Sequence, residues 1–165
     1  MTLAEAAARA NELAEASAER ELAELRAQWA DELEAAARSA DYRDRAVAYR
    51  AVGQFRFRAK TELLRRGLDD ESPACRGSAL VSLELLSRDS PGLVNAVRPL
   101  LHRLVSADEN AAVRRLAVFC LRNGSPQRDT VVLLEGLADH DDADRELRGA
   151  AGRIAATLKK KAGPR

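Results

Sequence analysis

Apolar residues in the second and third parts of the chain recur at a helical period around three arginines. Counted from Arg76, Arg114 and Arg148, positions −1, +3, +6, +7 and +10 fall within about 100° of arc on a helix. The residues there are almost all apolar or small: Cys75, Ala79, Ser82, Leu83 and Leu86; Val113, Ala117, Cys120, Leu121 and Gly124; Leu147, Ala151, Ile154, Ala155 and Leu158. The pattern predicts three amphipathic helices, each with one buried stripe.

A second apolar run precedes each of these helices. The runs cover about residues 62–68, 97–105 and 131–137 and are rich in Leu and Val. Since a short polar and acidic turn follows each run, we expect every pair of segments to form an antiparallel helical hairpin. A degenerate earlier hairpin is expected around Arg45, with its first helix over about residues 19–39.

An aspartate stands six residues before the arginine in each clear copy. The pairs are Asp70 with Arg76, Asp108 with Arg114, and Asp142 with Arg148. The copy around Arg45 has Ser39 at that position, and Asp41 is expected to cap the helix there instead.

These features resemble the HEAT repeat family of α-solenoids, including the HEAT-like units of the phycobilisome-lyase type. The resemblance rests on the Asp and Arg pairs, an apolar residue before each Arg, alanine three residues after it, and Pro99 inside a first helix. It implies an all-α, right-handed solenoid of about four antiparallel hairpins. It also implies a structural ladder in which each aspartate caps the second helix and each arginine reaches carboxylates at the turns between repeats. The expected ladder residues are Arg45, Asp70, Arg76, Asp108, Arg114, Asp142 and Arg148.

Three segments follow from this organisation. Residues 1–18 form an alanine-rich helical extension, residues 19–158 the repeat domain, and residues 159–165 a basic tail. The extension is expected to cover the end of the stack as a polar cap. The alternative is an arm for self-association as a coiled coil.

Composition supports an all-helical fold. The chain has 165 residues, of which 46% are hydrophobic and only 4% aromatic. Val, Ile and Thr are too few for the faces of a sheet, which argues against all-β and α/β folds. No segment is long and apolar enough to cross a membrane, and the N-terminus lacks the pattern of a signal peptide. We therefore expect a cytoplasmic protein without a membrane partner.

The net charge of +1 conceals opposite local charges. Residues 1–40 carry 4 basic and 9 acidic side chains, whereas residues 41–66 carry 8 basic and 3 acidic ones. Near-neutrality is thus a cancellation between segments, and it argues against a generally basic protein built for nucleic acid.

Motifs for catalysis, metals and cofactors are missing from the sequence, so we expect no enzyme, no catalytic residue, no metal and no cofactor. His102 and His140 are the only histidines, and neither begins the His-Glu motif of iron-carrying HEAT-like enzymes. The acidic turn at 139–144 is interpreted as a solvated helix cap. Cys75 and Cys120 are interpreted as buried, unpaired thiols, with bilin attachment or redox sensing as alternatives.

The face opposite the buried stripe is where a partner is expected to bind. Positions +1, +5 and +8 of the second helices point there, and they include the candidate partner-binding residues Arg50, Val81, Arg115, Phe119, Arg122 and Arg153. A mildly basic groove with apolar anchors fits an acidic or amphipathic segment of a partner protein. The hypothesis is thus a non-catalytic interaction module or adaptor. The alternatives are a nucleic-acid-binding protein, similar to the HEAT-like alkylpurine DNA glycosylases in its solenoid only, and a bilin-lyase-like enzyme.

Overall fold

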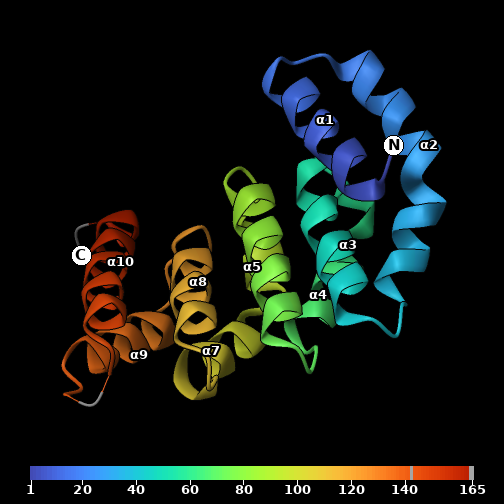
Figure 1. Ribbon diagram of the computed structural model, residues 1–165. Coiled ribbons are helices and arrows are strands. Elements are labelled where there is room, and N and C mark those ends of the chain that lie inside the picture. The colour runs from blue at the N-terminus through green and yellow to red at the C-terminus, as the bar shows by residue number, and fades with distance from the viewer. Residues whose placement is uncertain (142, 164–165) are drawn as a thin grey trace. The chain divides into compact units, whose positions relative to one another are not determined.

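The all-helical prediction is confirmed in a computed structural model, which describes residues 1–141 and 143–163 (Figure 1). Within those residues the elements are ten α-helices and one short 3-10 helix, without a strand. No helix in this part of the chain combines the length and apolar character needed to cross a bilayer. The chain divides into two compact units, Met1–Leu86 and Ser87–Arg165.

The first unit contains five α-helices and one short 3-10 helix. Its elements are α1 (Leu3–Glu15), α2 (Glu19–Ala37), α3 (Tyr42–Gln54), the 3-10 helix η1 (Arg58–Lys60), α4 (Thr61–Leu68) and α5 (Pro73–Ser87). Helices α2 and α3 form the hairpin expected around Arg45, and α4 and α5 form the next one. Asp41 caps α3 by accepting a hydrogen bond from the Arg43 amide at 2.9 Å, as expected.

The described part of the second unit contains five further α-helices. Its elements are α6 (Pro91–Asn95), α7 (Arg98–Ala107), α8 (Ala111–Arg122), α9 (Arg128–Ala138) and α10 (Arg145–Ala162). Helix α7 packs against α8 and α9 against α10, while α8 and α10 lie side by side. The short helix α6 was not predicted, and α10 extends through most of the expected basic tail. Three lysines in its last turn interact favourably with the helix dipole.

The predicted stripes are the core. All the positions of the three clear copies are buried in the structure, as are Ala48, Ala51, Val52 and Phe55 of the degenerate copy. Asp44, the polar residue on that stripe, is exposed. Small residues let the helices approach closely, since a Cβ on Gly53 of α3 would come within 2.7 Å of Ser82 Oγ on α5.

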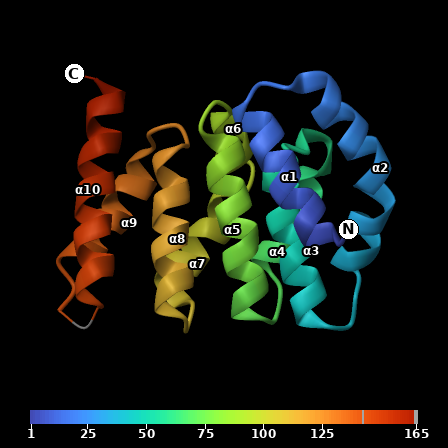
Figure 2. The same ribbon diagram turned by 45° about the horizontal axis from the view of Figure 1, so that its top comes forward.

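Helix α1 packs on α2 and α3 of its own unit (Figure 2). One face of α1 is fully enclosed there, formed by Leu3, Ala6, Ala7, Ala10 and Leu13. Its N-terminus has a reciprocal capping box, in which Thr2 Oγ1 accepts from the Glu5 amide and Glu5 accepts from the Thr2 amide. The N-terminal extension is thus an integral helix of the first unit.

Candidate functional site

Four of the six candidate partner-binding residues come together in the second unit. Arg115, Phe119 and Arg122 follow one another along a single face of α8, at the i, i+4 and i+7 positions. Arg153 lies on the neighbouring helix α10. We call the surface formed by Phe119, Arg122, Gly149, Arg153 and Ala156 the α8–α10 face.

Arg115 lies beside this face but is largely neutralised by carboxylates. Its Nη1 lies 3.0 Å from Asp144 Oδ2 and 3.6 Å from Glu146 Oε2. Asp144 also caps α10 by accepting a hydrogen bond from the Leu147 amide at 3.2 Å. Arg115 therefore joins α8 to the first turn of α10, and little of its charge is left for a partner.

Phe119 and Arg122 form the centre of the α8–α10 face. The Phe119 ring is half-buried, and the guanidinium carbon of Arg122 lies 6.0 Å from the ring centroid, which is cation–π geometry. Lys161 Nζ donates a hydrogen bond to the Arg122 carbonyl at 2.5 Å, so α10 adds a further cation at this end.

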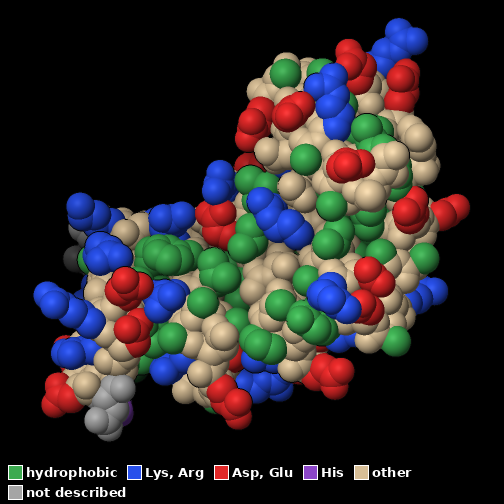
Figure 3. Space-filling model, viewed as in Figure 1, with side chains coloured by type: hydrophobic (Ala, Val, Ile, Leu, Met, Phe, Trp, Pro, Cys, Tyr) green, Lys and Arg blue, Asp and Glu red, His purple; other side chains and the backbone are tan. Residues whose placement is uncertain are grey.

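Arg153 supplies the most accessible charge of the face. Its side chain is exposed, and none of the hydrogen bonds or ion pairs between described residues involves its guanidinium. A Cβ on Gly149 would lie 3.2 Å from Arg153 Nη1, so the guanidinium lies over the small residue one turn before it. Figure 3 shows apolar side chains bordered by Lys and Arg on the surface over α8 and α10.

The other two candidates belong to α3 and α5 of the first unit, and they are less accessible. Arg50 is half-buried, and its Nη1 is enclosed without a hydrogen-bond partner among the described residues. Burial lowers the pKa of the Arg50 guanidinium. Val81 is half-buried as well. Neither offers an open anchor comparable to Phe119.

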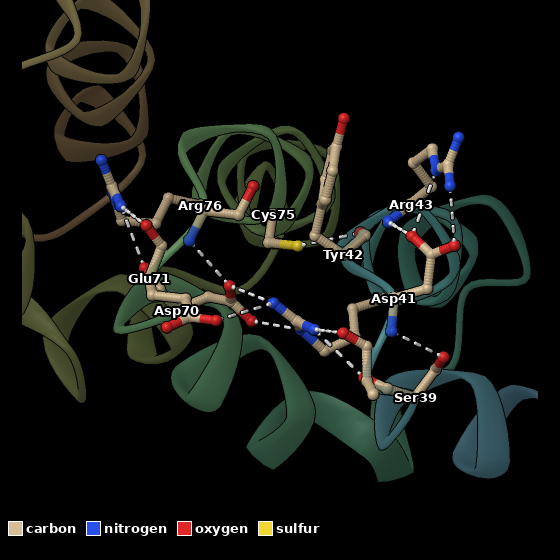
Figure 4. A network of polar contacts seen from close by, with 11 residues as sticks. Ser39, Asp41, Tyr42, Arg43, Asp70, Glu71, Cys75 and Arg76 are labelled. Atoms are coloured by element: carbon tan, nitrogen blue, oxygen red, sulfur yellow. Dashed lines mark hydrogen bonds and ion pairs between the residues drawn. The ribbon is translucent and has the colours of Figure 1, made fainter.

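Among the ladder residues, Arg45 and Asp70 form a two-pronged ion pair. Arg45 Nε donates to Asp70 Oδ2 at 2.9 Å and Nη2 donates to Oδ1 at 3.1 Å, with both side chains mostly buried (Figure 4). Burial alone would raise the pKa of Asp70, but hydrogen bonds from Arg45 and from the Ser72 amide outweigh it and lower the pKa below its usual value. The pair connects α3 to the turn that precedes α5.

The repeat arginines have a second role that sequence reasoning missed. Arg45 Nη1 donates to the carbonyls of Ser39 and Ala40, both at 3.1 Å, which stand six and five residues before it. Arg76 Nη1 donates to the carbonyls at the same two offsets, Asp70 at 3.0 Å and Glu71 at 3.2 Å. Each of these arginines therefore closes the turn of its own hairpin (Figure 4).

The two later arginines bind the end of the preceding helix instead. Arg114 Nε donates to the Val105 carbonyl at 2.8 Å, and Arg148 Nε donates to the Ala138 carbonyl at 3.3 Å. The expected ladder partner Asp142 lies outside the described residues.

The expected capping by the repeat aspartates needs correction. Asp70 and Asp108 accept hydrogen bonds from the amides two residues ahead, those of Ser72 and Asn110, both at 2.9 Å. These are Asx turns. The cap of α8 is Asn110, whose Oδ1 accepts from the Val113 amide at 3.0 Å. The aspartate shapes the turn, and a residue nearer the helix caps it.

Sequence reasoning also missed a buried polar cluster around Arg98. This guanidinium is 6% exposed and donates to Thr130 Oγ1 at 2.7 Å, to Asn95 Oδ1 at 2.5 Å and to the Ser125 carbonyl at 3.0 Å. Its Nε lacks a partner among the described residues. The available signal was its spacing, because Arg98, Leu101 and Val105 share one apolar stripe of α7.

His102 completes this cluster. Its Nε2 lies 2.8 Å from Thr130 Oγ1. Burial and the positive charge of Arg98 lower the pKa of His102, while Asp129 opposes the shift. The lowered pKa favours the neutral imidazole, and the histidine is a structural member of the cluster.

The described residues show no assembly suited to a metal. No group of three or more His, Cys, Asp or Glu side chains in this part of the chain could hold one. Cys75 and Cys120 are buried, as predicted, and neither forms a disulfide within the described residues. Cys75 Sγ donates to the Tyr42 carbonyl at 3.2 Å, and burial together with Asp70 raises the pKa of its thiol. This environment disfavours the reactive thiolate.

Comparisons of the chain with protein-family models, with curated proteins and with solved structures find no match.

Proposed function

We propose that the protein is a non-catalytic, HEAT-like helical-repeat module that binds an acidic, amphipathic helical segment of a partner protein through the α8–α10 face. The observation that carries this proposal is the half-buried Phe119 ring with Arg122 beside it on α8, together with the exposed Arg153 on the adjoining helix α10. Aromatic and arginine side chains dominate the energetics of protein interfaces.

The arrangement supports an acidic and partly apolar ligand. An apolar side chain of the partner would pack on the Phe119 ring and on the small surface of Gly149 and Ala156. A carboxylate of the partner would pair with Arg153. Desolvation by the surrounding contacts strengthens both interactions.

The repeat architecture belongs to the same proposal. The predicted outward positions after Arg114 belong to α8, and those after Arg148 belong to α10. The contact between these two helices supports the proposal. A right-handed solenoid of about four such hairpins would extend this pattern over the chain.

The test is affinity capture from a native extract with four proteins: the parent, Phe119→Ala, Arg153→Glu and the matched control Arg145→Glu. Arg145 is also an exposed arginine of α10, so the control changes the charge equally without touching the face. The proposal expects a captured protein that is lost with Phe119→Ala and Arg153→Glu and retained with Arg145→Glu. An identical set of captured proteins for all four would contradict it.

Nucleic acid is tested separately with a labelled mixed-sequence duplex. The proposal expects no binding that depends on Arg153. A different result would indicate that the partner is nucleic acid rather than protein. In that case duplex binding would weaken steeply with salt and would be abolished by Arg153→Glu but not by Arg145→Glu.

A further inference from the structure

The junction between α1 and α2 ends α1 with a strained residue. Ser17 has a φ of 56°, in the left-handed region. The Ser17 amide donates to the Ala14 carbonyl at 3.1 Å and the Ala18 amide to the Leu13 carbonyl at 2.9 Å, which together form a Schellman motif. This motif favours glycine at the left-handed position because an L side chain is strained there.

The same motif ends α3, but there the strain is compensated. Arg56 has a φ of 55°, and its Nη1 donates to the Gly53 carbonyl at 2.9 Å, the Gln54 carbonyl at 3.2 Å and Asn11 Oδ1 of α1 at 2.9 Å. Ser17 is exposed, and its hydroxyl has no such bond within the described residues. The bend at Ser17 therefore has the two backbone hydrogen bonds of the motif but not the side-chain bonds that accompany the bend at Arg56.

The residues around the bend favour a continuous helix. Positions 14–20 read Ala-Glu-Ala-Ser-Ala-Glu-Arg, without glycine or proline. Alanine, glutamate and arginine are strong helix formers, so straightening the junction would convert residues 3–37 into one helix. On that helix the buried stripes of α1 and α2 would lie about 140° apart at 100° per residue. Helix α1 could then no longer pack on its own unit.

A straightened chain would leave two complementary surfaces uncovered. One is the apolar stripe of α1, which contains Ala6, Ala7 and Ala10, all with 0% exposure in the closed form. The other is the surface of α2 and α3 on which α1 packs. A 13-residue helix is marginal in isolation, so α1 requires a docking surface.

We propose that two copies of this chain exchange α1. Each junction straightens at Ser17, and each α1 packs on α2 and α3 of the other copy with the contacts that it makes within one chain, including the hydrogen bond between Asn11 and Arg56. The exchange creates no new interface and removes two strained serines. Its cost is the entropy lost on association. The fraction of chains in the exchanged dimer therefore rises with protein concentration.

The first test compares junction variants by light scattering after size-exclusion chromatography over a range of concentrations. Ser17→Gly removes the strain of the closed form, so the dimer dissociation constant should rise roughly tenfold or more. Ser17→Val keeps the length and phase of the helix but makes the left-handed conformation more costly, so the dimer dissociation constant should fall. Ala10→Arg blocks the docking of α1 in both forms and should give only monomer.

The second test identifies which chains are connected. One chain carries Asn11→Cys and the other Arg56→Cys, both with Cys75→Ala and Cys120→Ala, and a short bismaleimide joins neighbouring thiols. A single chain with both cysteines is the positive control. After the two single-cysteine chains are incubated together, the exchange predicts a cross-linked pair of different chains, which Ser17→Gly in both chains should reduce.

Two results would overturn the exchange of α1. A Ser17→Val variant that remains monomeric at all concentrations would overturn it. A dimer whose dissociation constant is unchanged by Ser17→Gly and that gives no cross-link between different chains would also overturn it, since that dimer would use another surface. Both readouts are independent of Arg153 and of any partner protein, so they do not depend on the proposed function.

Discussion

A single guanidinium, that of Arg45, holds the Asp70 carboxylate with two hydrogen bonds of 2.9 and 3.1 Å. The same group donates to the carbonyls of Ser39 and Ala40. Arg45 thus joins the turn before α3 to the turn before α5 through one planar group with donors on several sides. The repeat arginine therefore acts within its own hairpin as well as between hairpins.

Asp70→Asn should destabilise the first unit by roughly 1–3 kcal/mol, because it weakens charge-assisted hydrogen bonds in a mostly buried site. The measurement is urea unfolding monitored by hydrogen exchange of α3 and α5. Glu71→Gln provides the matched control, since Glu71 is exposed and lies 3.8 Å from Arg45. A loss equal to that of the control would contradict this role.

The effect of Asp70 should depend on pH. Its pKa in the folded protein is lowered, so its contribution is fully present above the unfolded value of about 3.9 and disappears as pH falls through the folded value. The difference in stability between the parent and Asp70→Asn should therefore shrink below about pH 4. A difference that stays constant into strong acid would show that the carboxylate charge is irrelevant.

Two glycines should respond oppositely to alanine. Gly53→Ala forces a Cβ to within 2.8 Å of the Ser82 backbone and should destabilise the first unit by about 1–3 kcal/mol. Gly136→Ala in α9 meets open space and should stabilise by about 0.5–1 kcal/mol through helix propensity. Thermal unfolding of both variants checks the signs, and a stabilising Gly53→Ala would refute the close approach of α3 and α5.

Thr130→Val should destabilise the second unit by about 1–3 kcal/mol, because it removes an acceptor from the buried Arg98 while keeping the side-chain volume. Thr157→Val is the matched control, since Thr157 lies near the surface and bonds only to the carbonyl one turn before it. We expect it to change stability by less than about 0.5 kcal/mol. Hydrogen exchange in α7 and α9 distinguishes local from global unfolding.

His102 should make the second unit less stable in mild acid. Its pKa is lowered in the folded protein, so below the unfolded value of about 6.5 the unfolded chain binds a proton first and stability falls with pH. His102→Gln should flatten this dependence between about pH 7 and 5. A proton NMR titration of the His102 ring that gives a value at or above 6.5 would contradict the assignment.

Sequence reasoning succeeded where a property depends on spacing along one helix. Stripe positions such as Ala117 and Ile154 could be assigned to the core because the helical period alone decides which face they share. It failed for Arg98, whose guanidinium binds Thr130 Oγ1 and the Ser125 carbonyl outside its own helix. Arg115 shows the same limit, because its charge is compensated by Asp144 from the next hairpin.

The sequence by itself determined an all-helical chain and the apolar stripes that would be buried, because local periodicity and propensity suffice for both. Only the tertiary structure decided that α1 docks on α2 and α3, and that Arg45 binds Asp70 and two carbonyls at once. The physical reason is that hydrogen bonds and close approaches between helices depend on their relative position, which no single helical period contains.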